Sequence, residues 1–202
     1  MARRVIVTGG SGGIGRAIAS AFVIAGDQVI ITGRSPDRLH DAAAALRHGP
    51  GTVHPLISDL TEPTAAATMV ADGVALLGGF DVIVNNAGIA PISPLLGGPE
   101  ADEAWEAALA TNLTGPWRTI RAALPHLAGG GRIINIGALT GRIGATHYGA
   151  FCASKHGLIG LTRSLALDLA PRRITVNAVA PGWVDSALAE QTFEALAAHT
   201  GT

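Results

Sequence analysis

Short apolar runs alternate with longer alanine-rich stretches along most of the chain. Six runs rich in valine and isoleucine predict strands at residues 4–8, 28–32, 52–57, 81–85, 132–136 and 174–179. Because these runs are apolar on both faces, we expect a parallel sheet that helices cover on each side. The stretches between them predict helices at 14–25, 36–47, 62–77, 101–128 and 148–170, with one more after the last strand. The alternation predicts an α/β fold, a doubly wound parallel sheet of the Rossmann type, as one domain over residues 1–202.

Composition narrows the class of protein. The 202 residues suit one domain, and the net charge of −1, with scattered basic residues, argues against nucleic acid or an anionic membrane as a partner. No apolar run approaches the ~20 residues that cross a membrane, and the start "MARRVIVTGG" is too short for a signal-peptide core. The single cysteine, Cys152, leaves no internal disulfide and no cysteine-based metal cluster. We therefore expect a cytoplasmic protein with no metal site.

A glycine-rich segment, "VTGGSGGIG" (7–15), follows the first predicted strand and opens the first predicted helix. Glycines let the backbone approach a pyrophosphate, and the helix start offers free N–H groups. The second strand ends in "ITGRS", with Gly33 where an acidic residue would bind a ribose 2′-OH and Arg34 directly after it. This pattern favours NADP(H) over NAD(H). The alternatives are a turn without a ligand and an Arg34 that is only a surface charge.

The Gly- and Pro-rich stretch 88–100 reads as a loop after the fourth strand, and ligands of such sheets bind beyond the carboxyl ends of the strands. We expect this loop to be a pocket wall. Leu95, Leu96, Trp183 and the segment "TGPW" (114–117) suggest an apolar pocket for a small hydrophobic substrate, although Trp117 could equally belong to the core.

Several spaced motifs together resemble the short-chain dehydrogenase/reductase family, in particular its ketoreductases and 3-oxoacyl reductases. They are "TGGSGGIG" (8–15), "DL" (59–60), "NNAG" (85–88), "TNLTG" (111–115) and "PG" (181–182), and the resemblance runs from residue 3 to about 188. The family normally extends further, with another strand that also serves oligomer contacts, so this C-terminus is shorter than the family's norm. The resemblance implies a homodimer or homotetramer that meets through the helices at 101–128 and 148–170.

The resemblance also implies which residues hold NADP(H). They are Gly9, Ser11, Gly13, Ile14, Gly15, Arg34, Asp59, Leu60, Asn86, Ala87, Gly88, Lys155, Pro181, Gly182, Val184 and Ser186.

The catalytic residues depart from the family's pattern. Its carbonyl reductases use a serine after the fifth strand, a Tyr-x-x-x-Lys pair on the next helix and an asparagine that holds a proton-relay water. Lys155 and Asn112 match, but Phe151 stands four residues before the lysine, and Ala138 stands thirteen residues before Phe151. Both hydroxyl groups, including the phenol that would protonate the developing alkoxide, are therefore missing.

The single tyrosine of the chain, Tyr148, offers another proton donor. Seven residues at ~100° each would bring it back to nearly the same helix face as Lys155. The spacing Tyr148-x6-Lys155 resembles that of the family's enoyl-thioester reductases, in which hydride adds to a conjugated C=C and a tyrosine stabilises the enolate oxygen. The sequence thus predicts an NADPH-dependent reductase of a hydrophobic enone, enoyl thioester or ketone.

Other interpretations stay open. Tyr148 could be an aromatic at the pocket edge without a chemical role, and His147, Thr140 or Cys152 could supply a polar group instead. The chain could be a ketoreductase inactivated by serine-to-alanine and tyrosine-to-phenylalanine changes. It could also be a non-catalytic protein that binds NADP.

Overall fold

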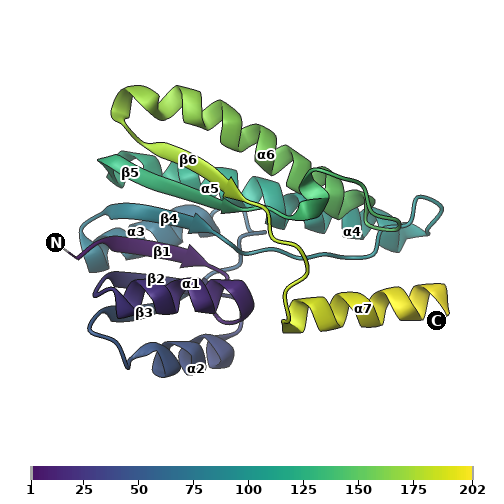
Figure 1. Ribbon diagram of the computed structural model, residues 1–202, viewed down its shortest axis with the longest axis horizontal. Helices are drawn as coiled ribbons and strands as arrows, with labels where there is room; N and C mark the ends of the chain where they lie inside the picture. The colour runs from purple at the N-terminus through teal and green to yellow at the C-terminus, as the bar shows by residue number, and fades with distance from the viewer. Residues whose placement is uncertain (1, 202) are drawn as a thin grey trace.

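Six parallel strands form one sheet in the computed structural model, which describes residues 2–201, and helices cover both of its faces (Figure 1). The strands are β1 (Arg4–Thr8), β2 (Gln28–Gly33), β3 (Thr52–Ile57), β4 (Phe80–Asn85), β5 (Leu127–Ile136) and β6 (Thr175–Val179). Their order across the sheet is β3-β2-β1-β4-β5-β6. The first three strands therefore run outward from β1 to one edge of the sheet, and the last three run outward from β4 to the other edge. This order is that of a doubly wound fold, and the predicted fold class is confirmed.

The longer helices are α1 (Gly13–Ile24), α2 (Pro36–Leu46), α3 (Ala65–Leu77), α4 (Pro99–Leu109), α5 (Gly115–Ala123), α6 (Gly149–Leu169) and α7 (Ala187–Thr200). Within the described residues, no helix is long and apolar enough to cross a membrane.

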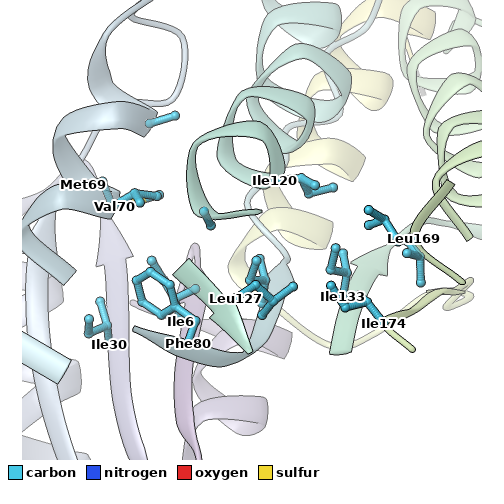
Figure 2. Close-up of a cluster of buried hydrophobic side chains, with 14 of the residues drawn as sticks. Ile6, Ile30, Met69, Val70, Phe80, Ile120, Leu127, Ile133, Leu169 and Ile174 are labelled. Atoms are coloured by element: carbon cyan, nitrogen blue, oxygen red, sulfur yellow. The ribbon is translucent and has the colours of Figure 1, made fainter. Parts of the chain in front are cut away.

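Alternation along β1 divides the core into two clusters. Ile6 packs with residues of α3, α5 and α6, in a cluster that includes the fully buried Phe80 (Figure 2). Val5 and Val7 lie in the other cluster, with residues of α1 and α2. Since neighbouring side chains of a strand point to opposite faces, one short apolar strand supplies both clusters. The two outer strands are less buried than predicted. One of the six residues of β3 is buried, and four of the five residues of β6 are exposed at the sheet edge.

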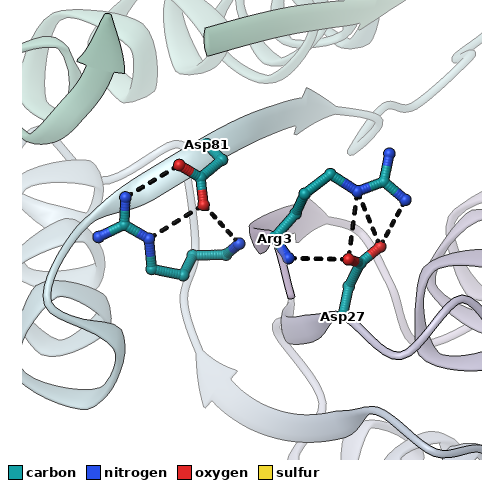
Figure 3. A network of polar contacts seen from close by, with 4 residues as sticks. Arg3, Asp27 and Asp81 are labelled. Atoms are coloured by element: carbon teal, nitrogen blue, oxygen red, sulfur yellow. Dashed lines mark hydrogen bonds and ion pairs between the residues drawn. The ribbon is translucent and has the colours of Figure 1, made fainter. Parts of the chain in front are cut away.

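Two arginines at the start of β1 join it to its neighbours. Arg3 donates to both carboxylate oxygens of Asp27, at 2.6–3.1 Å, and Arg4 does the same to Asp81, at 2.9–3.0 Å (Figure 3). Burial alone would raise the pKa of Asp27, but the hydrogen bonds from Arg3 outweigh it and leave that pKa lowered. The pairs hold the first residues of the central strand against the segments that begin β2 and β4.

The predicted helix at 101–128 is wrong as a single element. It is interrupted by a π-helical turn at Ala110–Thr114, ends at Ala123, and passes through a short 3₁₀ turn at Leu124–His126 into β5. Pro116 has no N–H to donate to the carbonyl four residues earlier, and the wider turn closes instead through a bond from the Gly115 N–H to the Ala110 oxygen. The apolar periodicity continues across this turn, so it does not show in the pattern.

Candidate functional site

A cavity of about 880 Å³ is lined by the loops that follow all six strands and by residues of α6 and α7. It therefore lies beyond the carboxyl ends of the strands, where the sheet order reverses. Each residue predicted to hold the cofactor lines this cavity except Gly15. Gly15 has a packing role, since a Cβ there would clash with the carbonyl of Gly9 and the side-chain amide of Asn86.

The glycine turn is shaped by close backbone approach. Gly9 has φ +66°, and a Cβ on it would lie 2.8 Å from the Cα of Ala87. Asn86 fixes the turn from the opposite loop, because its side-chain amide donates to the carbonyls of Thr8 and Gly9 at 3.0 and 3.1 Å. The sequence prediction of a tight strand–turn–helix is confirmed at this point.

The start of α1 faces open space in the cavity. A Cβ on Gly12 or on Gly13 would have one neighbouring atom within 4 Å, at 3.5 Å in each case. Gly12 has no capping side chain and the first turn of α1 contains no acidic residue, so its backbone N–H groups are free for an anion. This cradle has the size and polarity that a dinucleotide's phosphates need.

Two arginines stand at the side of the cavity formed after β2. Arg34 was predicted, whereas Arg38 was missed, although its position four residues later, in the first turn of α2, is the signal that could have found it. Both are exposed and line the cavity, and a Cβ on Gly33 would approach the Ser11 hydroxyl oxygen to 3.3 Å. The arrangement offers two guanidinium groups for one phosphate.

Asp59 follows β3 and is held in its charged form. Burial would raise its pKa, but bonds from the backbone N–H and hydroxyl of Thr61, at 3.0 and 2.8 Å, and the charge of Arg34 leave it lowered. The hydroxyl of the adjacent Ser58 is buried against the cavity wall and has no hydrogen-bond partner within residues 2–201. Nothing in the sequence pattern singled out Ser58.

Lys155 lies at the other side of the cavity, on α6, and is only 4% exposed. Its Nζ donates to the carbonyl of Ile136 at 2.7 Å and lies 5.7 Å from the centre of the Phe151 ring. Burial lowers the pKa of Lys155 to about 8. Ala138 and Phe151 both line the same cavity, and the apolar Phe151 ring lies close to the amine.

Asn112 sits at the centre of the π-helical turn and is 1% exposed. Its Oδ1 accepts from the Ile89 N–H at 2.9 Å, and its Nδ2 donates to the Ile89 carbonyl at 2.8 Å and to Ser154 at 3.0 Å. Asn112 thus joins α6 to the loop after β4 and does not itself line the cavity.

The structure contradicts the prediction that Tyr148 and Lys155 lie on the same face of one helix. It precedes α6, with φ −111° and ψ 33°, so the rotation of 100° per residue does not apply to it. Its ring lines the cavity, it is 5% exposed, and its hydroxyl donates to the carbonyl of Thr192 on α7 at 3.3 Å. Burial raises its pKa, so the phenol is protonated at neutral pH.

Several residues predicted to line the pocket do not. Leu95 and Leu96 are 100% and 99% exposed, and Trp117 is 42% exposed with Arg121 over its ring. These predictions were wrong because the sequence does not show in which direction an apolar side chain of a loop or a helix points. Trp183 does line the cavity and stacks on Phe193 of α7.

The other donors considered from the sequence have different surroundings. His147 packs edge-on against His199 and does not line the cavity, and Cys152 does not line it either. Thr140 lines the cavity, and its hydroxyl is buried without a partner in the described part of the chain.

The fold and the site define a dinucleotide-binding protein of the doubly wound class. The sequence matches the family model of the short chain dehydrogenases over residues 3–197, and the chain belongs to that family. It is 36% identical to the D-beta-hydroxybutyrate dehydrogenase of Rhizobium meliloti (strain 1021) over 197 residues, which cover 95% of this chain and 75% of that protein.

Two further comparisons agree with this membership. The chain is 38% identical to the 3-oxoacyl-acyl-carrier-protein reductase of Aquifex aeolicus, over 90% of this chain and 73% of that protein. A short chain dehydrogenase of Burkholderia cenocepacia J2315, solved in complex with NADP, superposes with a TM-score of 0.86 at 35% identity, over 92% of this chain and 76% of that one.

Proposed function

We propose that the cavity binds NADP(H) and that the chain is a reductase of a small hydrophobic enone, enoyl thioester or ketone. When bound, the cofactor would supply the hydride. The uncapped start of α1 and the side-chain-free Gly12 and Gly13 would hold its phosphates. Arg34 and Arg38 would hold the 2′-phosphate, and the structure of the Burkholderia relative with NADP supports this choice of nucleotide.

The family pattern assigns the missing hydroxyls to two positions. We infer that Ala138 and Phe151 occupy the places of the family's serine and tyrosine, because both line the cavity beside Lys155. Neither side chain can orient a carbonyl or donate a proton. Lys155 would still contact the ribose of the cofactor, but it has no phenol at position 151 whose pKa it could lower.

Tyr148 is the proton donor that remains. The observation that carries the proposal is that the only phenol of the chain lines the same cavity as Lys155. Its bond to the Thr192 carbonyl, at 3.3 Å, is long, so a rotation of the hydroxyl would redirect the proton toward a substrate oxygen. A phenol with a raised pKa suits donation or the stabilisation of an enolate by a hydrogen bond.

A second candidate is a protein that binds NADP(H) without turnover. It is favoured by the same bond, because the Tyr148 hydroxyl already donates to the Thr192 carbonyl of α7. On this reading Ala138 and Phe151 would have removed the reaction and kept the nucleotide site.

Restoring the hydroxyls separates these functions. NADPH binding is followed by the fluorescence of the nucleotide, and NADPH oxidation by absorbance, in the parent chain and in Ala138→Ser/Phe151→Tyr. The proposal predicts NADPH binding in both proteins and a gain in ketone reduction of about 10²–10⁴-fold in the double variant. A double variant that binds NADPH and gains no ketone reduction would show that positions 138 and 151 are not the family's catalytic positions.

A further inference from the structure

Lys155 is the only lysine among the 202 residues of the chain. It is buried in the wall of the large cavity, not on the surface where lysines usually lie. The two ion pairs formed among residues 2–201 are those of Arg3 and Arg4, so no carboxylate pairs with this amine. Burial is the cause of its lowered pKa, which means that the neutral amine is abundant near pH 8.

The groups around Nζ leave its lone pair free. One N–H of the neutral amine donates to the Ile136 carbonyl, and the Phe151 ring over which Nζ lies has no donor that could occupy the lone pair. The charged residues that line the cavity, Arg34, Arg38 and Asp59, follow β2 and β3. Since β2 lies three strands from β5 and β3 lies four, these groups stand about 14–19 Å away at ~4.8 Å per strand.

Gly88 leaves a small space beside the amine. A Cβ on it would lie 3.4 Å from Nζ and 3.2 Å from Oδ1 of Asn112, so a methyl group there would be in tight contact with both. Gly88 itself lines the cavity, and so do the apolar residues Ala138, Ile89 and Phe151.

We propose that Lys155 is a carbonyl-reactive amine, which condenses with apolar aldehydes that enter the cavity. This activity is separate from hydride transfer and requires no cofactor. Desolvated lysines in apolar pockets are the amines that form imines in proteins.

The condensation balances without a further reagent. The Nζ lone pair attacks the carbonyl carbon, the C=O π electrons become a hydroxyl after proton transfer, and the resulting carbinolamine loses water to leave a C=N bond. The two protons of the amine and the carbonyl oxygen leave together as that water. Neither Phe151 nor Ala138 can relay these protons, and the Tyr148 hydroxyl donates to the Thr192 carbonyl. Solvent therefore relays them, and we expect condensation to be slow compared with an enzyme's turnover.

The test uses the full chain without added nucleotide, 6-methoxy-2-naphthaldehyde as the carbonyl compound, and sodium cyanoborohydride to reduce the imine to a stable amine. Intact mass counts the adducts, and peptide mapping separates Lys155 from the amino terminus. Lys155→Arg is the matched control, because it keeps a cation and lacks the nucleophile. Circular dichroism checks that the variant is folded.

We expect one adduct at Lys155, with a rate that reaches half its maximum near pH 8. At pH 7 the rate should exceed that of Nα-acetyl-lysine roughly 300-fold, since a pKa of about 8 in place of 10.5 raises the neutral fraction at that pH by about this factor. Gly88→Ala should slow the labelling, because the added methyl fills the space in front of Nζ.

Labelling confined to the amino terminus, or a Lys155 rate equal to that of the free amino acid, would overturn the proposal. Addition of NADPH separates it from the proposed function. Protection of Lys155 from labelling by NADPH supports both the reactive amine and the proposed cofactor site. Labelling that NADPH does not slow supports the reactive amine and counts against cofactor binding beside it.

Discussion

Lys155→Met should change the pH dependence of stability by an amount that follows from the burial of one amine. The folded pKa is about 8 against an ordinary value of 10.5, so the unfolded chain binds more protons between these two pH values. The buried charge therefore destabilises the parent fully below pH 8, and this penalty disappears as the pH rises toward 10.5. At ~1.36 kcal/mol per pKa unit the penalty is about 3 kcal/mol, and about 2.5 kcal/mol of it is relieved between pH 7 and 10.

The assay is urea unfolding of parent and variant at several pH values from 7 to 10, followed by tryptophan fluorescence. Loss of the bond to the Ile136 carbonyl shifts the variant equally at every pH, so only the slope of the difference is diagnostic. Arg163→Met, which removes an exposed charge from the same helix, should show no slope. A difference between parent and Lys155→Met that stays constant within about 0.5 kcal/mol would refute a desolvated amine with a lowered pKa.

Three further changes test other parts of the structure. Asp27→Asn should lower the free energy of unfolding by about 1.5 kcal/mol at pH 7, since it breaks a charge-assisted pair whose arginine is half exposed. Because the folded pKa of Asp27 lies below the ordinary value of 3.8, this loss should stay full above pH 3.8 and shrink as the pH falls below it. Equilibrium unfolding at pH 7 and below pH 3.8 measures the loss, and an unchanged loss at the lower pH would contradict the lowered pKa. Gly9→Ala should lower the melting temperature by about 4–8 °C, because a methyl group at φ +66° and in contact with Ala87 should destabilise the fold by about 2 kcal/mol. An unchanged melting temperature in calorimetry would contradict the close approach of the two backbone segments. Arg34→Ala should weaken NADPH binding roughly tenfold or more and leave NADH binding unchanged, because NADH has no 2′-phosphate. Fluorescence titration measures both affinities, and equal effects on the two nucleotides would contradict a contact between Arg34 and the 2′-phosphate.

The hydrophobic pattern predicted most of the fold because the sheet is buried in a regular way. Residues 4–8 and 52–57 were predicted to their exact ends, since β-branched residues and flanking glycines or polar residues mark both limits. The start of β5 at Leu127 was missed, because the glycines at 129–131 read as a turn although they continue the strand. The π-helical turn was missed because helical periodicity hardly changes when one residue is added.

The candidate site was predictable where a backbone conformation demands a residue type. Gly9 and Gly13, with φ +66° and +48°, are visible in the sequence for that reason. The position of Tyr148 was not, because its hydroxyl is placed by a contact with Thr192, forty-four residues away. Spacing along one helix cannot report such a contact, and the residue lies just before that helix begins.

The most direct test of the proposed reductase is single-turnover oxidation of NADPH with matched enone and ketone thioesters, in the parent chain and in Tyr148→Phe. Products are identified by mass, and NADPH binding is measured in both proteins, because loss of a hydroxyl that contacts α7 could also affect the nucleotide site. We predict enone reduction in the parent and a loss of about 10²–10⁴-fold in the variant, with NADPH binding retained. NADPH bound by the parent without oxidation by either thioester would contradict the reductase and favour a nucleotide-binding protein. Equal turnover in both proteins would show that Tyr148 is not the proton donor.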